Sequence, residues 1–265
     1  MEIISKISKG SKMDQIYIPK NRLGFETGNY VVIRPVDEQK PIENLFLYGV
    51  KKIEPIKMEI IKEIIRIIDK SIRNYQNIIF TGSFLDNGFS FNDIDFIIIT
   101  EKENNYSSTK EEVYNKFGIK ADILSLSNSS LLKGLEIDPL YQVMLSKRIS
   151  KNRTFYNTKN KLNYKLLDLH LMKSKVLIDN FDILSGSEKY VLVRNMIAIY
   201  LFLEGKKLNK DLIDNEIKRI FFIKDISELR QNLIDKNKFL NKYKLIYNKT
   251  FSRILRGIQN GAEQK

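Results

Sequence analysis

Two apolar runs joined by a short polar spacer constrain this chain more than any other stretch. Residues 78–80 lead into Gly82-Ser83, and after a nine-residue spacer Asp93-Ile94-Asp95 leads into a second run over residues 96–99. Short apolar runs bounded by turn residues predict buried strands. Because side chains alternate along a strand, Asp93 and Asp95 are expected on one side of it.

This carboxylate pair needs a compensating charge. Two carboxylates that face one way from an apolar strand repel each other and resist burial, so a cation is expected between them. Asp122 lies in a third short run, residues 119–126, and would add an oxygen ligand if that strand pairs beside the second. The sequence therefore predicts a divalent-metal site at Asp93, Asp95 and Asp122. The alternative is a solvated turn, which would leave Ile94 and its apolar neighbours exposed.

The order of these motifs also carries a family resemblance. Glycine-serine, a nine-residue spacer, Asp-x-Asp and a later isolated acid resemble the DNA polymerase β nucleotidyltransferase superfamily, over residues 78–126. The resemblance implies that the backbone at Gly82 and the hydroxyl of Ser83 hold the β- and γ-phosphates of a nucleotide, at a turn that opens a helix. Glycine lets the backbone approach an anion, and a helix N-terminus carries partial positive charge.

The same resemblance implies a reaction. Asp93 and Asp95 would bind two Mg²⁺ ions, which Mn²⁺ can replace, and Asp122 would help to bind the ion that activates the attacking hydroxyl. The nucleotide would be an NTP, with ATP expected, and pyrophosphate would leave. Asp93, Asp95 and Asp122 are thus both the predicted catalytic and the predicted metal-binding residues.

Two positions depart from the family pattern. Many small members carry a basic residue two places after the serine, whereas this chain has Leu85 there and an acid, Asp86, next. Many also have serine before the first acid, where this chain has Asn92, which can still hydrogen-bond locally. The positive charge that a triphosphate needs is therefore expected from another part of the chain.

The basic residues are concentrated in the C-terminal part. Residues 151–265 hold 24 Lys and Arg against 12 Asp and Glu, an excess of 12 out of the net charge of +13. A neutral catalytic segment joined to a basic one suits an enzyme that captures a polyanion with one part and modifies it with another. The alternative is a nucleotide bias or heat adaptation, with lysines that only solvate helix faces.

The scarcity of soft metal ligands excludes other chemistries. The chain has no cysteine, which rules out disulfides and thiolate sites, and His170 is its single histidine, so a histidine-cluster zinc site is not expected. The longest apolar run, residues 196–203, is far shorter than the roughly 20 residues that span a bilayer. The first ten residues do not resemble a secretory signal. We therefore expect a cytoplasmic protein with no membrane partner.

An N-terminal segment has a different pattern. Residues 15–35 predict two short strands joined by a glycine turn, with alternating apolar residues at Ile16 and Ile18 and again over 30–33. The stretch is similar to half of a swapped-hairpin domain of the AbrB type, a family that dimerises and binds DNA through such hairpins. Two strands alone are not stable in water, so this segment is expected to form a homodimer or to dock on the catalytic part. Residues 1–50 carry a net charge of only +1, which argues against DNA binding.

The remaining patterns predict helices. They cover residues 56–72 and 107–117 around the strands, residues 140–145, and then 162–181, 188–203, 211–222, 227–235 and 239–258. The predicted fold class is α+β: a small mixed β-sheet nucleotidyltransferase core with an N-terminal β-hairpin segment and an all-helical C-terminal domain. The predicted domains are residues 1–50, 51–155 and 156–265. Arg194 is expected as a salt-bridged core arginine rather than as part of the nucleotide pocket.

The acceptor hydroxyl stays open at this stage. It could belong to an RNA 3′ end, which the basic C-terminal half favours, to a partner protein that is adenylylated on tyrosine or serine, as by antitoxin-type members, or to a small molecule. A catalytically silent nucleic-acid-binding protein is the alternative from another class. The presence of all three acids argues against it.

Overall fold

The computed structural model describes residues 7–18, 44–72, 74–89, 91–102 and 104–262. The chain divides into two compact units, Met1–Ile42 and Glu43–Lys265. In the first unit, β1 (Ile7–Ser8) pairs antiparallel with β2 (Gln15–Ile16). A strand is therefore present near Ile16 as predicted, with Ile7–Ser8 as its partner. The second predicted strand, over residues 30–33, lies outside the described residues.

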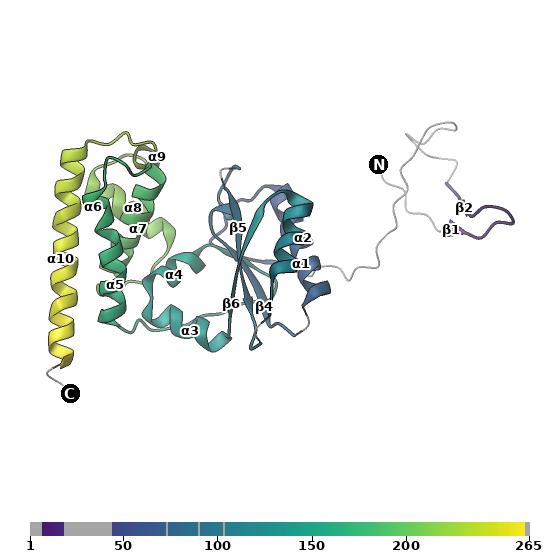
Figure 1. Ribbon diagram of the computed structural model, residues 1–265, viewed down its shortest axis with the longest axis horizontal. Coiled ribbons are helices and arrows are strands. Elements are labelled where there is room, and N and C mark those ends of the chain that lie inside the picture. The colour runs from purple at the N-terminus through teal and green to yellow at the C-terminus, as the bar shows by residue number, and fades with distance from the viewer. Residues whose placement is uncertain (1–6, 19–43, 73, 90, 103, 263–265) are drawn as a thin grey trace. The chain divides into compact units, whose positions relative to one another are not determined.

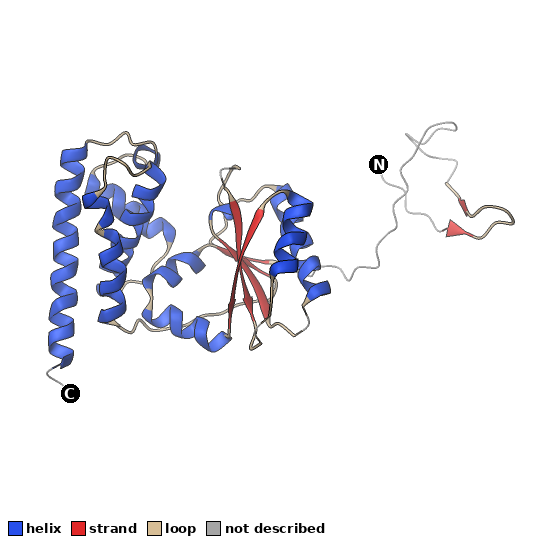
Figure 2. Cartoon of the chain, in the orientation of Figure 1, coloured by secondary structure: helices blue, strands red, loops and turns tan. Residues whose placement is uncertain are grey.

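The second unit is built on a five-stranded mixed sheet. Its strands are β3 (Phe46–Tyr48), β4 (Asn77–Thr81), β5 (Asp93–Ile99), β6 (Lys120–Leu126) and β7 (Arg148–Ser150). They lie in the order β3-β7-β4-β5-β6, with β5 and β6 parallel and the other pairs antiparallel. Parallel neighbours need a crossover connection, and α2 (Ser107–Phe117) provides it. This mixed sheet with its helices confirms the predicted α+β class (Figure 2).

Helices lie on both faces of the sheet (Figure 1). One face carries α1 (Pro55–Ser71) and α2, and the other carries α3 (Asn128–Ile137) and α4 (Pro139–Ser146). The α1 helix starts at proline, which suits a first helical turn, and it buries isoleucines spaced by three or four residues: Ile61, Ile64, Ile65 and Ile68. On the opposite face, Ile97 and Ile99 pack against leucines of α3 and α4.

Among its described residues, the C-terminal part contains helices joined by loops and no strand, as predicted. Its helices are α5 (Tyr164–Ser174), α6 (Val176–Asp179), α7 (Gly186–Leu203), α8 (Lys210–Phe221), α9 (Ile226–Arg230) and α10 (Lys236–Ala262). The α7 helix packs against α4, α5, α8, α9 and α10, so it is the centre of this part and its link to the sheet. A capping box starts it, in which Ser185 Oγ accepts the Glu188 N–H and the Glu188 carboxylate accepts the Ser185 N–H. Among the described helices, none combines the length and apolar character needed to cross a membrane.

The structure differs from the predicted elements at several places. The single helix predicted over 162–181 is interrupted after Ser174, where a turn at Lys175 lets Leu177 and Phe181 join the core around α7. The helix predicted over 227–235 ends at Arg230. The strands β3 and β7 and the helix α3 were not predicted. Strands of three residues are too short to show a repeating apolar pattern.

Candidate active site

The three predicted acids lie on two neighbouring strands. In the parallel pair β5–β6, Asp95 is directly opposite Asp122, and Asp93 precedes Asp95 by two residues on the same face. β5 is only partly buried at the two acids and fully buried over residues 96–99. The pairing of the third predicted strand beside the second, which the Asp122 prediction required, is therefore observed.

Uncompensated negative charge marks this row of acids. Burial, reinforced by the charges of Asp93 and Asp122, raises the pKa of Asp95 to about 6. Within the described residues, none of the three carboxylates has an ion-pair partner among the lysines, arginines and the histidine. A set of carboxylates with only oxygen donors fits a hard divalent cation such as Mg²⁺ or Mn²⁺.

The three carboxylates do not converge on one point. Among the residues that the structure describes, no three His, Asp or Glu side chains are grouped closely enough to hold a metal ion as they stand. Like charges favour separated side-chain conformations. The backbone register of the two strands, rather than the present side-chain arrangement, is thus the fixed part of the candidate metal site.

Gly82 brings the end of β4 into direct contact with Asp95. Its φ of +80° favours glycine, and a Cβ at this position would lie 1.9 Å from Asp95 Oδ2. Thr81, the preceding residue, pairs with Asp95 across β4–β5. The glycine turn therefore lies directly against the central acid, and a larger residue at this position would displace the Asp95 carboxylate.

The turn at Ser83 is shorter than the family resemblance implies. It forms η1 (Ser83–Leu85), a single 3₁₀ turn, instead of opening a longer helix. Leu85, at the position where many family members carry a basic residue, is fully buried. Ser83 itself is exposed, so its hydroxyl remains accessible to a ligand.

A buried lysine fixes the loop that follows this turn. Lys57 Nζ is fully buried and donates to the backbone carbonyls of Asp86 and Gly88 at 2.6 and 2.5 Å. It forms an ion pair with Glu54 at 3.1 Å, though not in hydrogen-bond geometry. Glu54 also accepts the Gly88 N–H at 2.6 Å, and this bond is the main cause that lowers the pKa of Glu54 to about 2. Three aromatic rings, with centroids 5.2–5.6 Å from Nζ, enclose the ammonium: Phe84, Phe89 and Phe91.

A cleft of about 530 Å³ opens between the sheet and the helical part. Gly82, Ser83 and Asp93 line it from the sheet, whereas Asp95 and Asp122 are not among its described lining residues. Four cationic side chains line it as well: Lys147, Arg194, Lys210 and Arg230. Apolar side chains that include Phe91 and Val191 complete its wall. The cleft therefore combines cations suited to phosphates with apolar surface suited to a base or ribose.

An internal carboxylate engages two of these cations. Asp86 Oδ1 accepts from Lys147 Nζ at 2.9 Å, and both Asp86 oxygens accept from Lys210 Nζ at 2.8 and 2.7 Å. Burial alone would raise the pKa of Asp86, but the hydrogen bonds from the two lysines outweigh burial and lower it. Asp86 therefore stays ionised beside the glycine turn.

Arg194 differs from its prediction. It lines the cleft, its guanidinium donates to Asn195 Oδ1 at 3.2 and 3.0 Å, and it pairs with no carboxylate among the described residues. Burial lowers its pKa, as expected for a cation whose charge is only partly compensated. Lys147, Lys210 and Arg230 were not predicted as site residues, because contacts between distant segments leave no local pattern in a sequence.

The burial of Lys57 was also not predicted, although the apolar pattern of α1 indicated it. Helix α1 buries a face at Ile61, Ile64 and Ile68, and Lys57 is the residue four places before the first of them. A lysine at an apolar-face position is costly to bury unless it is paired. The pattern therefore indicated a specific partner for this lysine.

Comparisons with known proteins do not assign a family. No protein-family model matches the chain, and no curated protein matches it significantly. Among solved structures, a chain of the tri-AMPylated HEPN toxin of Shewanella oneidensis in complex with the MNT antitoxin resembles part of it, with 14% identity and a TM-score of 0.27. That likeness covers 37% of this chain and 73% of the other. A likeness at this TM-score decides neither fold nor activity.

Proposed function

We propose that this protein is a nucleotidyltransferase, which moves a nucleoside monophosphate from an NTP to an acceptor hydroxyl. The observation that carries the proposal is the direct register of Asp95 with Asp122, beside a glycine turn that leaves no room for a side chain against Asp95. A row of acids and a phosphate-accessible turn thus meet at one place, as the resemblance to the DNA polymerase β superfamily implies.

Asp93, Asp95 and Asp122 would hold two Mg²⁺ ions in this proposal. When bound, such ions neutralise charge on the reacting phosphate and lower the pKa of an attacking hydroxyl. The contribution of the chain is to fix the acids on adjacent strands and, as far as the described residues show, to leave them without lysine or arginine partners. With a pKa of about 6, Asp95 is ionised at neutral pH and free to bind a cation.

The triphosphate would lie between the glycine turn and the cations of the cleft. The basic residue that many family members carry at the position of Leu85 has no equivalent there in this chain. Its charge would come from Lys147, Arg194, Lys210 and Arg230, which belong to segments distant in the sequence. Because Asp86 already binds Lys147 and Lys210, the phosphates would share these two lysines with a carboxylate.

The proposed step is an in-line displacement at the α-phosphorus. The acceptor oxygen forms a bond to phosphorus while the bond from phosphorus to the α,β-bridging oxygen breaks. Pyrophosphate leaves with that oxygen and its electron pair, and the hydroxyl proton passes to solvent. ATP is the expected nucleotide, so AMP would be the group transferred.

Transfer from NTPs that carry a radioactive α-phosphate tests this proposal. Wild-type protein with Mg²⁺ and total RNA or lysate should label one class of acceptor, and Asp95→Asn should lower labelling by about 10³-fold, because charge is removed where charge develops. Glu111→Gln, an exposed acid on α2, is the control and should label normally. Labelling that persists in Asp95→Asn would refute the proposal. Wild-type protein that labels nothing from any NTP would instead support a catalytically silent nucleic-acid-binding protein.

A further inference from the structure

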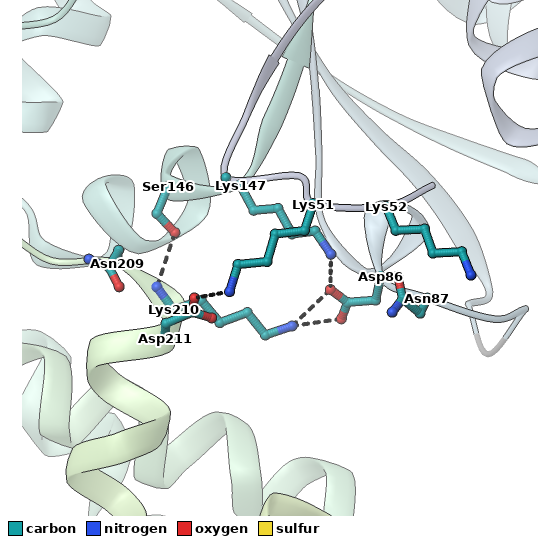
Figure 3. Close-up of a pocket in the computed structure, with 10 residues that line it drawn as sticks. Lys51, Lys52, Asp86, Asn87, Ser146, Lys147, Asn209, Lys210 and Asp211 are labelled. Atoms are coloured by element: carbon teal, nitrogen blue, oxygen red, sulfur yellow. Dashed lines mark hydrogen bonds and ion pairs between the residues drawn. The ribbon is translucent and has the colours of Figure 1, made fainter. Parts of the chain in front are cut away.

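A second cavity, of about 590 Å³, adjoins the cleft (Figure 3). Charged side chains dominate its lining: Lys51, Lys52, Lys147, Lys210, Asp86 and Asp211. Its other described lining residues are glycine, serine and asparagine, so they offer no aromatic or aliphatic surface to a base or a ribose. The cavity therefore suits a small ligand whose negative charges lie close together.

The two carboxylates compensate the lysines unequally. Asp86 is bound by Lys147 and Lys210, as Figure 3 shows. Lys51 pairs with Asp211 at 3.1 Å, but both side chains are highly exposed, at 87% and 73%, so this pair is weak. The other lysine of the turn, Lys52, has no ion-pair partner among the described residues. These two neighbouring lysines are therefore the cations most available to a ligand.

Ser146, the last residue of α4, joins three parts of the cavity wall. A Cβ at Gly49 would lie 2.3 Å from the Ser146 carbonyl oxygen, so the turn that leads from β3 to Lys51 lies directly against it. The Ser146 hydroxyl accepts the N–H of Lys210, the first residue of α8, at 3.3 Å (Figure 3). Lys51, Lys147 and Lys210 are therefore held around one space by contacts that need no ligand.

The cavity meets the cleft at the cations proposed for the triphosphate. Asp86, Lys147 and Lys210 line both spaces, whereas the three acids of the candidate metal site are not among the described lining residues of the cavity. In an in-line displacement the leaving group departs on the side opposite the attacking oxygen. Pyrophosphate would therefore separate from the α-phosphorus beside these lysines, next to the cavity and away from the acceptor.

We infer that this lysine-lined cavity receives pyrophosphate after transfer and leads it from the cleft to solvent. The inference rests on the proposed function and adds a product site to it. Cleavage leaves a full negative charge on the oxygen that bridged the α- and β-phosphates, so free pyrophosphate is more anionic than the same two phosphates within an NTP. Lys51 and Lys52 add two cations to those that the phosphates already meet in the cleft. The attraction of the cavity therefore increases once the bond has broken.

Isothermal titration calorimetry with sodium pyrophosphate, without metal or NTP and at about 0.15 M salt, tests the inference. Lys51→Gln/Lys52→Gln should weaken pyrophosphate binding by about tenfold. ATP binding should weaken by less than about twofold, because neither lysine lines the cleft and added salt screens more distant charges. Lys110→Gln/Lys133→Gln, which removes the same charge from exposed positions on α2 and α3, should change pyrophosphate binding by less than about twofold.

Product inhibition of the transfer reaction reports on the same cavity during turnover. Added pyrophosphate should inhibit labelling by the wild-type protein. Lys51→Gln/Lys52→Gln should need about tenfold more pyrophosphate for the same inhibition, in proportion to its weaker binding. Lys110→Gln/Lys133→Gln should be inhibited as the wild type is.

Each other outcome has a defined meaning. Equal losses of pyrophosphate binding in the two double variants would overturn the inference, since net charge alone would then explain binding. Inorganic phosphate that binds as tightly as pyrophosphate would also overturn it, because the cavity would then recognise a single phosphate group. Normal labelling together with pyrophosphate binding that does not depend on Lys51 and Lys52 would overturn the product site and keep the transferase. Pyrophosphate binding through these lysines without labelling from any NTP would refute both the transferase and the exit role.

Discussion

Asp86 and Lys210, 124 residues apart in the chain, approach to 2.7 Å beside the cleft. The carboxylate belongs to the loop after η1, and the ammonium belongs to the first residue of α8. The pair therefore joins the sheet to the helical part. Its carboxylate also engages one of the ammonium groups that a triphosphate would need.

Removing the Asp86 charge should increase the affinity for ATP. Asp86→Asn frees Lys147 and Lys210 from a competing anion, and the expected gain is about fivefold, which corresponds to ~1 kcal/mol for one charge at about 4 Å in water. Isothermal titration calorimetry measures it. Asp211→Asn removes an exposed carboxylate that does not line the cleft and should leave ATP binding nearly unchanged. Weaker ATP binding by Asp86→Asn would show that Asp86 positions the lysines instead of competing with phosphates.

Divalent-metal binding should depend on the protonation of Asp95. Because its pKa in the folded protein is about 6, the carboxyl is protonated below that pH and cannot bind a cation. Mn²⁺ affinity should therefore fall by about tenfold for each pH unit below 6. Electron paramagnetic resonance of free Mn²⁺ can follow this. The dependence should disappear in Asp95→Asn, and an unchanged pH profile in that variant would exclude Asp95 as the titrating ligand.

The same shift makes a prediction for stability. The folded pKa of Asp95 lies above its ordinary value of 3.8, so the ionised form is disfavoured by folding. The free-energy cost of ionising Asp95 in the folded protein is absent below pH 4, develops between pH 4 and 6, and is complete above pH 6. Asp95→Asn should stabilise the metal-free protein at pH 7 by about 1 kcal/mol, less than the full shift would give, since the carboxyl is partly solvated. Urea unfolding at pH 4 and pH 7 measures it, and an equal effect at both values would contradict the explanation.

A comparison of Gly82→Ala with Gly205→Ala separates the effect of backbone strain from that of a steric clash. Both Gly82 and Gly205 have positive φ, +80° and +74°, but a Cβ at Gly205 meets nothing within 4 Å, whereas one at Gly82 meets the Asp95 carboxylate. Each substitution should cost about 1 kcal/mol of stability from strain. Gly82→Ala alone should also lower transfer by about 10²-fold, because it displaces a reacting-site ligand by an ångström or more. Equal transfer rates in the two variants would contradict the role of this contact.

Lys57→Met should destabilise the fold while removing only one charge. The substitution leaves the Asp86 and Gly88 carbonyls without a donor and Glu54 without its cation, so a loss of about 3 kcal/mol is expected. Lys62→Met is the control on the same helix, because Lys62 pairs with Glu59 at the surface and should contribute less than about 1 kcal/mol. Urea denaturation distinguishes the two. A loss below 1 kcal/mol for Lys57→Met would show that the loop carbonyls are satisfied in another way.

The strand positions of the three acids could be predicted because the information for them is local in the sequence. The alternation along a strand put Asp93 and Asp95 on one face, and the apolar run around Asp122 indicated a neighbouring strand. The helices of the C-terminal part were visible for a similar reason, since their apolar spacing repeats over several turns.

The cations of the cleft were not visible in the same way. Lys147 follows α4, and Lys210 is the first residue of α8. The apolar patterns of these two helices do not show what the helix ends contact. Arg194 was expected to be salt-bridged because it lies within an apolar helix, yet its guanidinium extends to the cleft. The strands β3 and β7 were not predicted because three residues cannot show a repeating apolar pattern. The pairing of β3 with β7 places Lys51 and Lys52 near Lys147, so this placement could not be predicted either.

The enclosure of Lys57 has a consequence for how this protein can change over time. Its ammonium is held by two loop carbonyls, by Glu54 and by three phenylalanine rings, so a substitution of Glu54 or of one of these rings removes part of its surroundings. Relatives with an apolar residue at position 57 are expected to differ at position 54 and in the loop at the same time. The first turn of α1 and the segment that carries Phe84, Phe89 and Phe91 should thus be inherited together, although 26 positions separate Lys57 from the start of η1 at Ser83.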